Sequence, residues 1–141
     1  MITRLAHLCL KTDNLGRMTD FYTQVLGLKI KFSFRNAGGQ VFGHYFELGS
    51  MSFLEIFDIR LSAEQWGGRV KALSPQAPST YQHFCLEVKG IEAVVRELSE
   101  KGVDVSPVKV GMDNSKQVWI KDPDGNQIEF MEYTETSLQV Q

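Results

Sequence analysis

The chain lacks the features that mark a partner of nucleic acids or membranes. Its 141 residues include no long apolar stretch that could span or enter a membrane, and no run of Lys or Arg suited to tracking phosphates. The formal net charge is only -2 at pH 7, so the chain carries no broad field of one sign. We therefore expect neither nucleic acid nor a membrane among its partners.

Cysteine is also scarce. The two cysteines, Cys9 and Cys85, are not spaced like a disulfide framework, and the first residues contain no apolar segment of signal-peptide length. These two absences favour a reduced, cytoplasmic protein. The hydrophobic content is 43%, which at this length can fill one core but not two separate ones. We expect a single domain over residues 1–141.

What the chain does have is a repeat. The phrase His-Leu-Cys-Leu begins at His7, and the phrase His-Phe-Cys-Leu begins at His83. Each phrase is later followed by an apolar residue and a glutamate, Glu55 in the first copy and Glu129 in the second, at nearly the same offset. Self-similarity at a fixed offset indicates tandem units. Each unit therefore supplies one imidazole and one carboxylate.

The two copies also share an order of expected elements. After each His, an apolar stripe of helical spacing ends at a glycine, Gly27 or Gly102, and strand-like runs follow. This predicts two β-α-β-β-β units, residues 1–59 and 81–133. The expected strands cover residues 2–10, 29–35, 41–48 and 53–59 in the first unit, and residues 103–110, 117–121 and 127–133 in the second, which opens with a strand after residue 81. The connector at residues 60–80 holds a short helix at 62–66, and the polar tail at residues 134–141 is expected to fray.

Strand alternation places each glutamate on the mixed face of its sheet. Alternate side chains of a strand point to opposite faces, so Glu55 shares its face with Phe53 and Phe57, whereas Leu54 and Ile56 form the more apolar face. A carboxylate among aromatic side chains is costly to bury unless it is paired or bound to a metal. The glutamate of the second unit lies in a similar setting. The face that carries the glutamates is therefore expected to line a cavity.

A divalent cation explains all four repeated side chains together. Two neutral imidazoles and two carboxylates neutralise a 2+ ion and form a mixed nitrogen and oxygen ligand set. His7, Glu55, His83 and Glu129 are therefore the candidate ligands of one metal ion per site, with Ni, Co, Zn, Mn and Fe all open. Small buried thiols are common packing residues, and we expect that role for the two cysteines. His44 has no counterpart in the second unit and is expected to be structural.

Three segments, spread along almost the whole chain, resemble those of a known family. They are Asp-Phe-Tyr-Thr-Gln-Val-Leu-Gly-Leu at residues 20–28, Gln-His-Phe-Cys-Leu-Glu-Val at 82–88, and Asp-Pro-Asp-Gly-Asn-Gln-Ile-Glu at 122–129. With the opening His, they resemble the vicinal oxygen chelate superfamily, which includes glyoxalase I, extradiol dioxygenases and bleomycin-resistance proteins. The resemblance implies an α+β fold of two tandem β-α-β-β-β units whose mixed sheet curls around a metal-binding cavity. It also implies a homodimer, as in most small members, with sites that can be shared between chains.

Within this superfamily the ligand pattern is most similar to that of glyoxalase I. The similarity implies that His7, Glu55, His83 and Glu129 hold the metal. It further implies a metal-dependent lyase or isomerase that transfers a proton, through a metal-stabilised enediolate, on a small carbonyl or thiol-adduct substrate. Glu129 would be the catalytic base, and Glu55 is the second candidate by symmetry.

Substrate recognition departs from the glyoxalase I pattern. The Asn-Trp-Gly segment that helps those enzymes to hold glutathione is absent after Glu55, and Lys11 stands where an arginine often lies. Lys11 and Lys109 are the candidate residues for binding an anionic small-molecule substrate. Two alternatives stay open. One is another metalloenzyme of the superfamily, such as an epimerase, an extradiol-type dioxygenase or an antibiotic thiol transferase, and the other is a non-catalytic protein that binds a small molecule.

Overall fold

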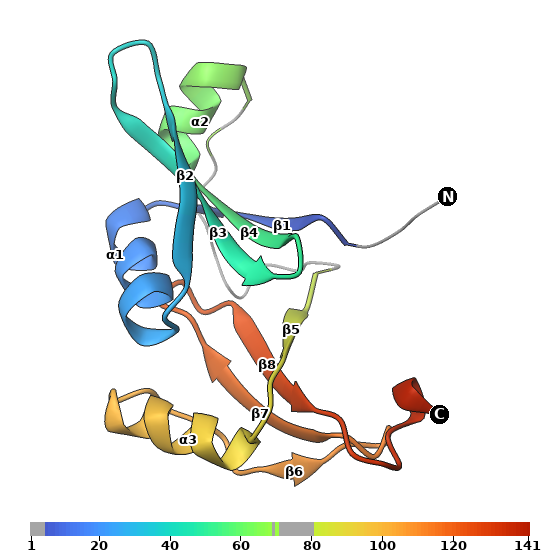
Figure 1. Ribbon diagram of the computed structural model, residues 1–141. Coiled ribbons are helices and arrows are strands. Elements are labelled where there is room, and N and C mark those ends of the chain that lie inside the picture. The colour runs from blue at the N-terminus through green and yellow to red at the C-terminus, as the bar shows by residue number, and fades with distance from the viewer. Residues whose placement is uncertain (1–4, 69, 71–80) are drawn as a thin grey trace. The chain divides into compact units, whose positions relative to one another are not determined.

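The computed structural model, which describes residues 5–68, 70 and 81–141, divides into two compact units. Unit 1 comprises residues 1–74 and unit 2 comprises residues 75–141. Each unit contains one four-stranded mixed sheet with helices between its strands (Figure 1). The β-α-β-β-β order expected from the repeat is confirmed in both units, and the α+β class is confirmed with it.

The sheet of unit 1 has the strand order β1-β4-β3-β2. Strand β1 runs parallel to β4, whereas the other neighbours are antiparallel, and the sheet has two free edges and does not close. The elements of unit 1 are β1 (His7–Thr12), α1 (Leu15–Asp20), the π-helical turn η1 (Phe21–Val25), β2 (Lys29–Arg35), β3 (Val41–Gly49), β4 (Ser52–Asp58) and α2 (Ile59–Trp66).

The sheet of unit 2 repeats this topology with the order β5-β8-β7-β6. Strand β5 is parallel to β8 and the remaining pairs are antiparallel, so this sheet is open as well. The elements of unit 2 are β5 (His83–Glu87), α3 (Ile91–Glu100), β6 (Lys109–Val110), β7 (Lys116–Lys121), β8 (Gln127–Glu132) and the 3-10 turn η2 (Leu138–Val140).

The helix of each unit ends at the glycine that the sequence indicated. Gly27 and Gly102 have φ angles of 70° and 78°, in the left-handed region that favours glycine after a last helical turn. At the other end of α1, the side-chain oxygen of Asn14 accepts a hydrogen bond of 3.0 Å from the backbone N–H of Arg17. Local capping therefore sets the length of the first helix.

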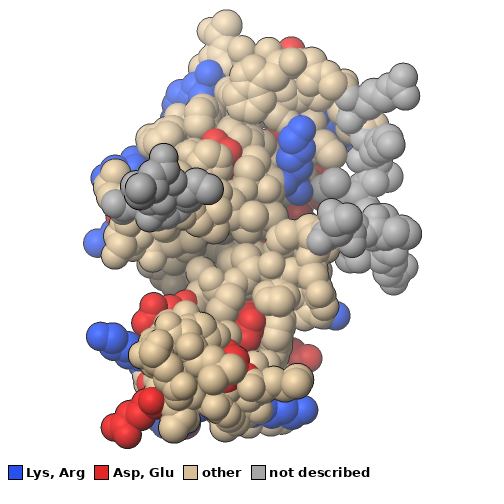
Figure 2. All heavy atoms as spheres, turned by 90° about the vertical axis from the view of Figure 1, so that its right-hand side faces the viewer, with Lys and Arg blue, Asp and Glu red and all other residues tan. Residues whose placement is uncertain are grey.

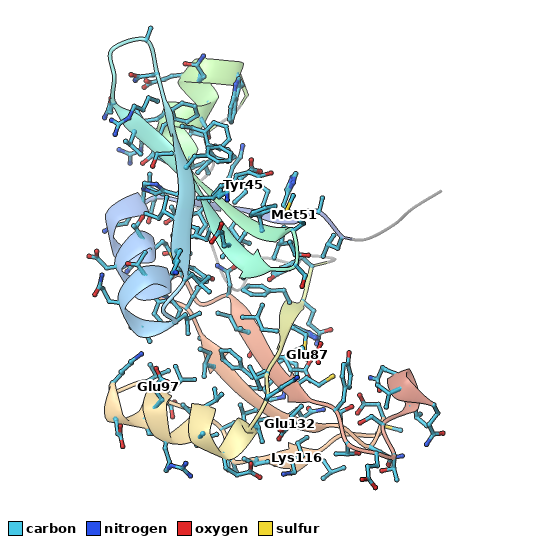
Figure 3. The ribbon with its side chains drawn as sticks, viewed as in Figure 1. Tyr45, Met51, Glu87, Glu97, Lys116 and Glu132 are labelled. Carbon is cyan, nitrogen blue, oxygen red and sulfur yellow. The ribbon has the colours of Figure 1, made fainter. Side chains whose placement is uncertain are left out.

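The start of α3 is capped from a distant strand. The Glu132 carboxylate of β8 accepts hydrogen bonds from the backbone N–H groups of Gly90 and Ile91, at 2.6 and 3.2 Å. Lys116 of β7 lies beside it, 3.9 Å from Glu132 and 2.7 Å from Glu92 of the helix (Figure 3). These contacts tie the start of α3 to the two inner strands of its own sheet.

One face of each sheet forms the core. Helix α1 packs against β3 and β4, and α3 packs against β7 and β8. The apolar side chains on these faces are almost completely buried, as strand alternation predicted. They include Met18, Tyr22, Phe46, Leu54 and Ile56 in unit 1, and Ile91, Leu98, Val118, Ile120 and Ile128 in unit 2. The opposite face of each sheet carries the His and Glu of the repeat.

The predicted strand at residues 103–110 is wrong over most of its length, because only Lys109–Val110 pair as β6. Pro107 has no N–H to donate to a ladder. Ser106 supplies two hydrogen bonds to β7 in place of regular strand pairing. Its N–H donates to the Trp119 carbonyl at 3.0 Å, and its hydroxyl accepts from the Trp119 N–H at 2.9 Å. Alternation of valines with polar residues over 103–110 therefore does not produce a paired strand here.

The tail at residues 134–141, which the sequence predicts to fray, makes hydrogen bonds within unit 2. Ser137 is fully buried, and its hydroxyl accepts hydrogen bonds from Ser115 Oγ at 2.9 Å and from the backbone N–H of Thr134 at 2.8 Å. The Leu138 N–H also donates to the Asp113 carbonyl at 2.9 Å. A polar segment without periodicity is therefore held by side-chain hydrogen bonds.

Two element boundaries in unit 1 differ from the prediction. The first strand runs from His7 to Thr12, while residues 2–4 of the predicted strand lie outside the described residues. The fourth strand ends at Asp58, whose carboxylate accepts from two backbone N–H groups at 2.9 Å and so begins α2 three residues before the predicted helix. Residues 69 and 71–80 of the connector also lie outside the described residues.

Candidate metal-binding and catalytic site

Unit 1 brings His7 and Glu55 together on one face of its sheet. The parallel register of β1 and β4 sets Cys9 opposite Glu55, and His7 lies two residues earlier on the same face. The distance from His7 Nε2 to Glu55 Oε2 is 3.6 Å, which is longer than a hydrogen bond. The side chain of His7 is 43% exposed and that of Glu55 only 13%. The pair is an accessible imidazole beside a largely buried carboxylate.

Unit 2 repeats this arrangement with His83 and Glu129. Cys85 of β5 lies opposite Glu129 of β8, so the histidine again stands two residues before the position that faces the glutamate. His83 Nε2 is 3.2 Å from Glu129 Oε2, and the two side chains are 32% and 7% exposed. The repeat in the sequence is therefore also a repeat in sheet register.

The pair of unit 2 has the spacing of two neighbouring ligands of a divalent cation, and the pair of unit 1 is slightly wider. Bonds of about 2.0–2.2 Å from such a metal to nitrogen or oxygen put adjacent donor atoms roughly 3.0–3.4 Å apart. The observed separations are 3.6 Å in unit 1 and 3.2 Å in unit 2. Within the described part of the chain, no three His, Cys, Asp or Glu side chains gather closely enough to hold a metal ion. The structure thus shows two His–Glu pairs, and the binding of one metal ion by all four side chains stays a prediction.

A thiol accompanies each pair. Partial burial raises the pKa of Cys9 to about 12, and its hydrogen bond to Glu55 and the charge of that carboxylate act in the same direction. Partial burial also raises the pKa of Cys85 to about 12, followed by the charge of Glu129 and the hydrogen bond to it. Because only a thiolate is a good nucleophile, neither cysteine is poised to react at neutral pH. The Cys9 thiol also donates a weak hydrogen bond to the Leu10 carbonyl at 3.9 Å.

Tyr45 is a further residue of the unit 1 site, and the sequence analysis did not single it out. It lies on β3 directly opposite Glu55, and its hydroxyl is 2.9 Å from Nδ1 of His7 (Figure 3). Its ring stacks on Phe32 of β2, with centroids 4.7 Å apart and planes at 16°. The signal was present in the alternation of residues 41–48, which puts this aromatic on the face that carries the glutamate.

Trp119 is the corresponding residue of unit 2. It lies on β7 directly opposite Glu129, and its ring meets His83 edge to face, with centroids 4.7 Å apart and planes at 75°. Its indole N–H donates to Gln117 Oε1 at 3.0 Å. Trp119 also borders a cavity of about 310 Å³ within unit 2. This cavity is lined by Asp104, Ser106, Trp119, Ile120, Lys121 and Gln127.

The two candidate substrate-binding lysines lie in different settings. Lys11 is exposed on β1, on the same face as His7 and Cys9, and its charge acts on the Cys9 thiol. Lys109 is exposed on β6, which forms the edge of the unit 2 sheet and is separated from β5 by two strands. Lys11 therefore shares the strand and the face of His7, whereas Lys109 lies on a strand that is not adjacent to that of His83.

His44 has the structural setting that the sequence suggested. Its Nδ1 is 2.8 Å from Ser33 Oγ on the neighbouring strand, and its ring meets Phe46 of the core at a centroid distance of 5.8 Å. Burial, together with the charge of Arg35, lowers the pKa of His44. The residue belongs to the helix-covered face and not to the face of His7 and Glu55.

The surface offers few clues to a macromolecular partner. Among the described residues on the face drawn in Figure 2, basic and acidic side chains are both scattered and gather into no large patch of one sign. In the described ranges, no helix has the length and apolar content needed to cross a membrane.

Comparison with known proteins identifies the family. A profile of the Glyoxalase/Bleomycin resistance protein/Dioxygenase superfamily matches residues 4–130. This chain belongs to that superfamily, as its resemblance to vicinal oxygen chelate proteins implied. Its open, paired β-α-β-β-β sheets are those of a glyoxalase-like fold.

Individual relatives are distant. A lactoylglutathione lyase of Escherichia coli O157:H7 is 27% identical over 133 residues, which cover 92% of each chain. The crystal structure of a lactoylglutathione lyase from Agrobacterium tumefaciens has a TM-score of 0.68 at 23% identity, covering 93% of this chain and 94% of that one. An antibiotic-binding protein from Streptomyces sp. CB03234 has a TM-score of 0.69 at 19% identity, covering 94% and 98%. Similarity at these levels to the two structures establishes the fold alone.

Proposed function

We propose that the protein is a divalent-metal-dependent lyase or isomerase of the glyoxalase I type, acting on a small carbonyl or thiol-adduct substrate. The observation that carries this proposal is the repeated pair: His7 with Glu55, and His83 with Glu129, in the same register of the two sheets. Together they offer two imidazoles and two carboxylates, which neutralise a 2+ ion. Distant homology to lactoylglutathione lyases supports the same chemistry.

Glu129 is the proposed base that moves a proton between adjacent carbons of the substrate. Its side chain is only 7% exposed and lies beside the Cys85 thiol and the His83 imidazole. Glu55 has the same position in its sheet but is more exposed, so it is the second candidate. A divalent cation bound by these residues would offset the negative charge that develops on the substrate oxygens.

The residues around Glu55 argue against glutathione as the required thiol. Where glyoxalase I enzymes carry their Asn-Trp-Gly segment, this chain has Asp58, and its carboxylate is used to cap α2. Lys11, exposed on the face of His7, is the proposed contact for an anionic group of the substrate, and Lys109 is the second. The proposed substrate is therefore a small carbonyl compound or a thiol adduct, with the identity of the thiol left to the experiment below.

We also propose a homodimer, because a chain with two half-sites can complete a site within one copy or between two. The experiment is to mix two inactive variants, His7→Ala/Glu55→Ala and His83→Ala/Glu129→Ala, and to let their subunits exchange. Recovery of metal binding in the mixture supports sites shared between chains. No recovery, with a dimer still present by light scattering, supports sites within one chain.

The function is tested by proton exchange. The protein, loaded in turn with Ni²⁺, Co²⁺ or Zn²⁺, is given hemithioacetals of an oxoaldehyde with glutathione and with smaller thiols in D₂O, and deuterium in the product is followed by NMR. We expect turnover that EDTA abolishes and fresh metal restores. Oxygen uptake with a catechol and Fe²⁺ would instead indicate a dioxygenase. A protein that takes up none of these ions would be a small-molecule binding protein on the same fold.

A further inference from the structure

The two repeated imidazoles differ in what holds their second nitrogen. Nδ1 of His7 lies 2.9 Å from the Tyr45 hydroxyl. Nδ1 of His83 is buried and has no hydrogen-bond partner among the described residues. Trp119, which occupies the position of Tyr45 in unit 2, cannot serve His83, because its only donor is directed to Gln117. The two His–Glu pairs therefore differ in whether a hydroxyl group lies at Nδ1 of the histidine.

This difference decides where the imidazole proton can reside. A histidine that binds a cation through Nε2 must carry its proton on Nδ1, and a partner for that proton fixes the ring. At His7 the Tyr45 oxygen is such a partner, while Nε2 is too far from Glu55, at 3.6 Å, to donate a hydrogen bond to it. At His83 a proton on Nδ1 would be buried without an acceptor. A proton on Nε2 has the Glu129 carboxylate as an acceptor, 3.2 Å away.

The Tyr45 hydroxyl is held firmly in place. Its ring is stacked on Phe32 and tilted against Phe53, with centroids 4.7 and 5.3 Å away. The antiparallel pairing of β3 with β4 sets the residue opposite Glu55, on the face of His7. Because packing and register both restrain the ring, the hydroxyl is preorganised before any ligand arrives.

We propose that Tyr45 is a positioning residue of the metal site: it accepts the Nδ1–H of His7 and so keeps Nε2 free for the cation. The proposal rests on the metal-dependent function above. It makes His7 the preorganised imidazole and His83 the one that must reorganise when metal binds. Loss of the hydroxyl therefore weakens metal binding without disturbing the fold, and it changes the tautomer of one histidine only.

The test uses the full-length protein and the variant Tyr45→Phe, which keeps the ring and removes only the hydroxyl. Tyr133→Phe, an exposed tyrosine just after β8, is the matched control. The tautomers of the histidines are read by ¹⁵N–¹H NMR of the metal-free proteins at about pH 8.5, where an ordinary histidine is neutral. The affinity for Co²⁺ alone is measured by competition with a chromophoric chelator, and stability by thermal unfolding.

We expect His7 of the wild type as the Nδ1–H tautomer, a shift toward Nε2–H in Tyr45→Phe, and a Co²⁺ affinity reduced about 10- to 100-fold. His83 and the control should be unchanged. Wild-type His7 in the Nε2–H form, or equal affinities for Tyr45→Phe and wild type, would overturn the role of Tyr45 while leaving the metal site intact. A wild type that binds no Co²⁺, Ni²⁺ or Zn²⁺ would overturn both proposals, so the two failures are distinguishable.

Discussion

Tyr45 and Trp119 occupy the same position in the two sheets, and each stands directly opposite the glutamate of its pair. The Tyr45 hydroxyl lies 2.9 Å from Nδ1 of His7, whereas the Trp119 ring meets the His83 ring edge to face. The two units have thus kept one architecture while diverging at the residue that orients the histidine. A substitution at Trp119 can test whether the hydroxyl itself matters.

Trp119→Tyr should bind Co²⁺ more tightly than Trp119→Phe, by about tenfold, because only the tyrosine offers an acceptor near the unpaired Nδ1 of His83. Both substitutions replace the indole by a smaller ring, so the comparison isolates one oxygen atom. The measurement is chelator competition on both variants, with circular dichroism to verify folding. Equal affinities would mean that the aromatic position does not govern imidazole orientation in unit 2.

Glu129→Gln should reduce turnover by about 10²- to 10⁴-fold, because an amide cannot accept the proton. Its loss of metal affinity should be smaller than that of His83→Ala, since the amide oxygen remains a possible ligand. Turnover and Co²⁺ affinity are measured on both variants. Glu100→Gln, a change at an exposed position in α3, is the control for the loss of a negative charge. An equal loss of metal in the two site variants would refute the separate role of Glu129 as base.

The two thiols should alkylate slowly in the native, metal-free protein. With the pKa of Cys9 and Cys85 raised to about 12, the thiolate fraction at pH 8 is on the order of one in ten thousand, far below that of an ordinary cysteine. The thiolate fraction rises with pH, so the rate with iodoacetamide should still be climbing above pH 9. Unfolding in urea should accelerate it strongly.

The variant Glu55→Gln separates the effect of burial on the pKa of Cys9 from the effect of the Glu55 carboxylate. Removing the carboxylate charge should lower the pKa of Cys9 and speed its alkylation, while Cys85 in the other unit serves as an internal control. Peptide mass spectrometry after timed quenching gives both rates from one sample. Rapid modification of both cysteines in the native protein at pH 8 would contradict the raised pKa values.

Gly43→Ala should destabilise unit 1 by about 1–3 kcal/mol through overpacking. A Cβ atom at Gly43 would lie 2.2 Å from the Phe57 ring and 3.0 Å from the Ile56 carbonyl oxygen. Gly16→Ala is the matched control: its nearest neighbour would be 3.7 Å away, and alanine is a better helix former than glycine within α1. Urea unfolding of both variants provides the comparison, and unchanged stability of Gly43→Ala would show that the ring moves freely.

The sequence predicted the parts of the fold that repeat. Strand alternation around Glu55 and Glu129, the apolar stripes after each histidine, and the two helix-ending glycines all reflect local periodicity. Both sheets formed as expected, and each brings its repeated His and Glu onto one face. A second copy of a pattern acts as an independent check on the first, which is why the repeated topology was predictable.

What the sequence did not predict depends on contacts between distant residues. The tail is held by Ser115 and Ser137, and α3 is capped by Glu132 from another strand. Such hydrogen bonds leave no periodic trace. Tyr45 and Trp119 were missed for a related reason: an aromatic residue in a strand is usually read as packing, and only the register reveals that it touches a histidine.

The central claim is that both His–Glu pairs serve one cation, and metal stoichiometry tests it most directly. Elemental mass spectrometry is performed on wild type, His7→Ala/Glu55→Ala and His83→Ala/Glu129→Ala, each purified without chelating resin and again after reconstitution. We predict about one divalent ion per chain in the wild type and almost none in either double variant. Absence of metal from the wild type, or full retention by one of the variants, would contradict the claim.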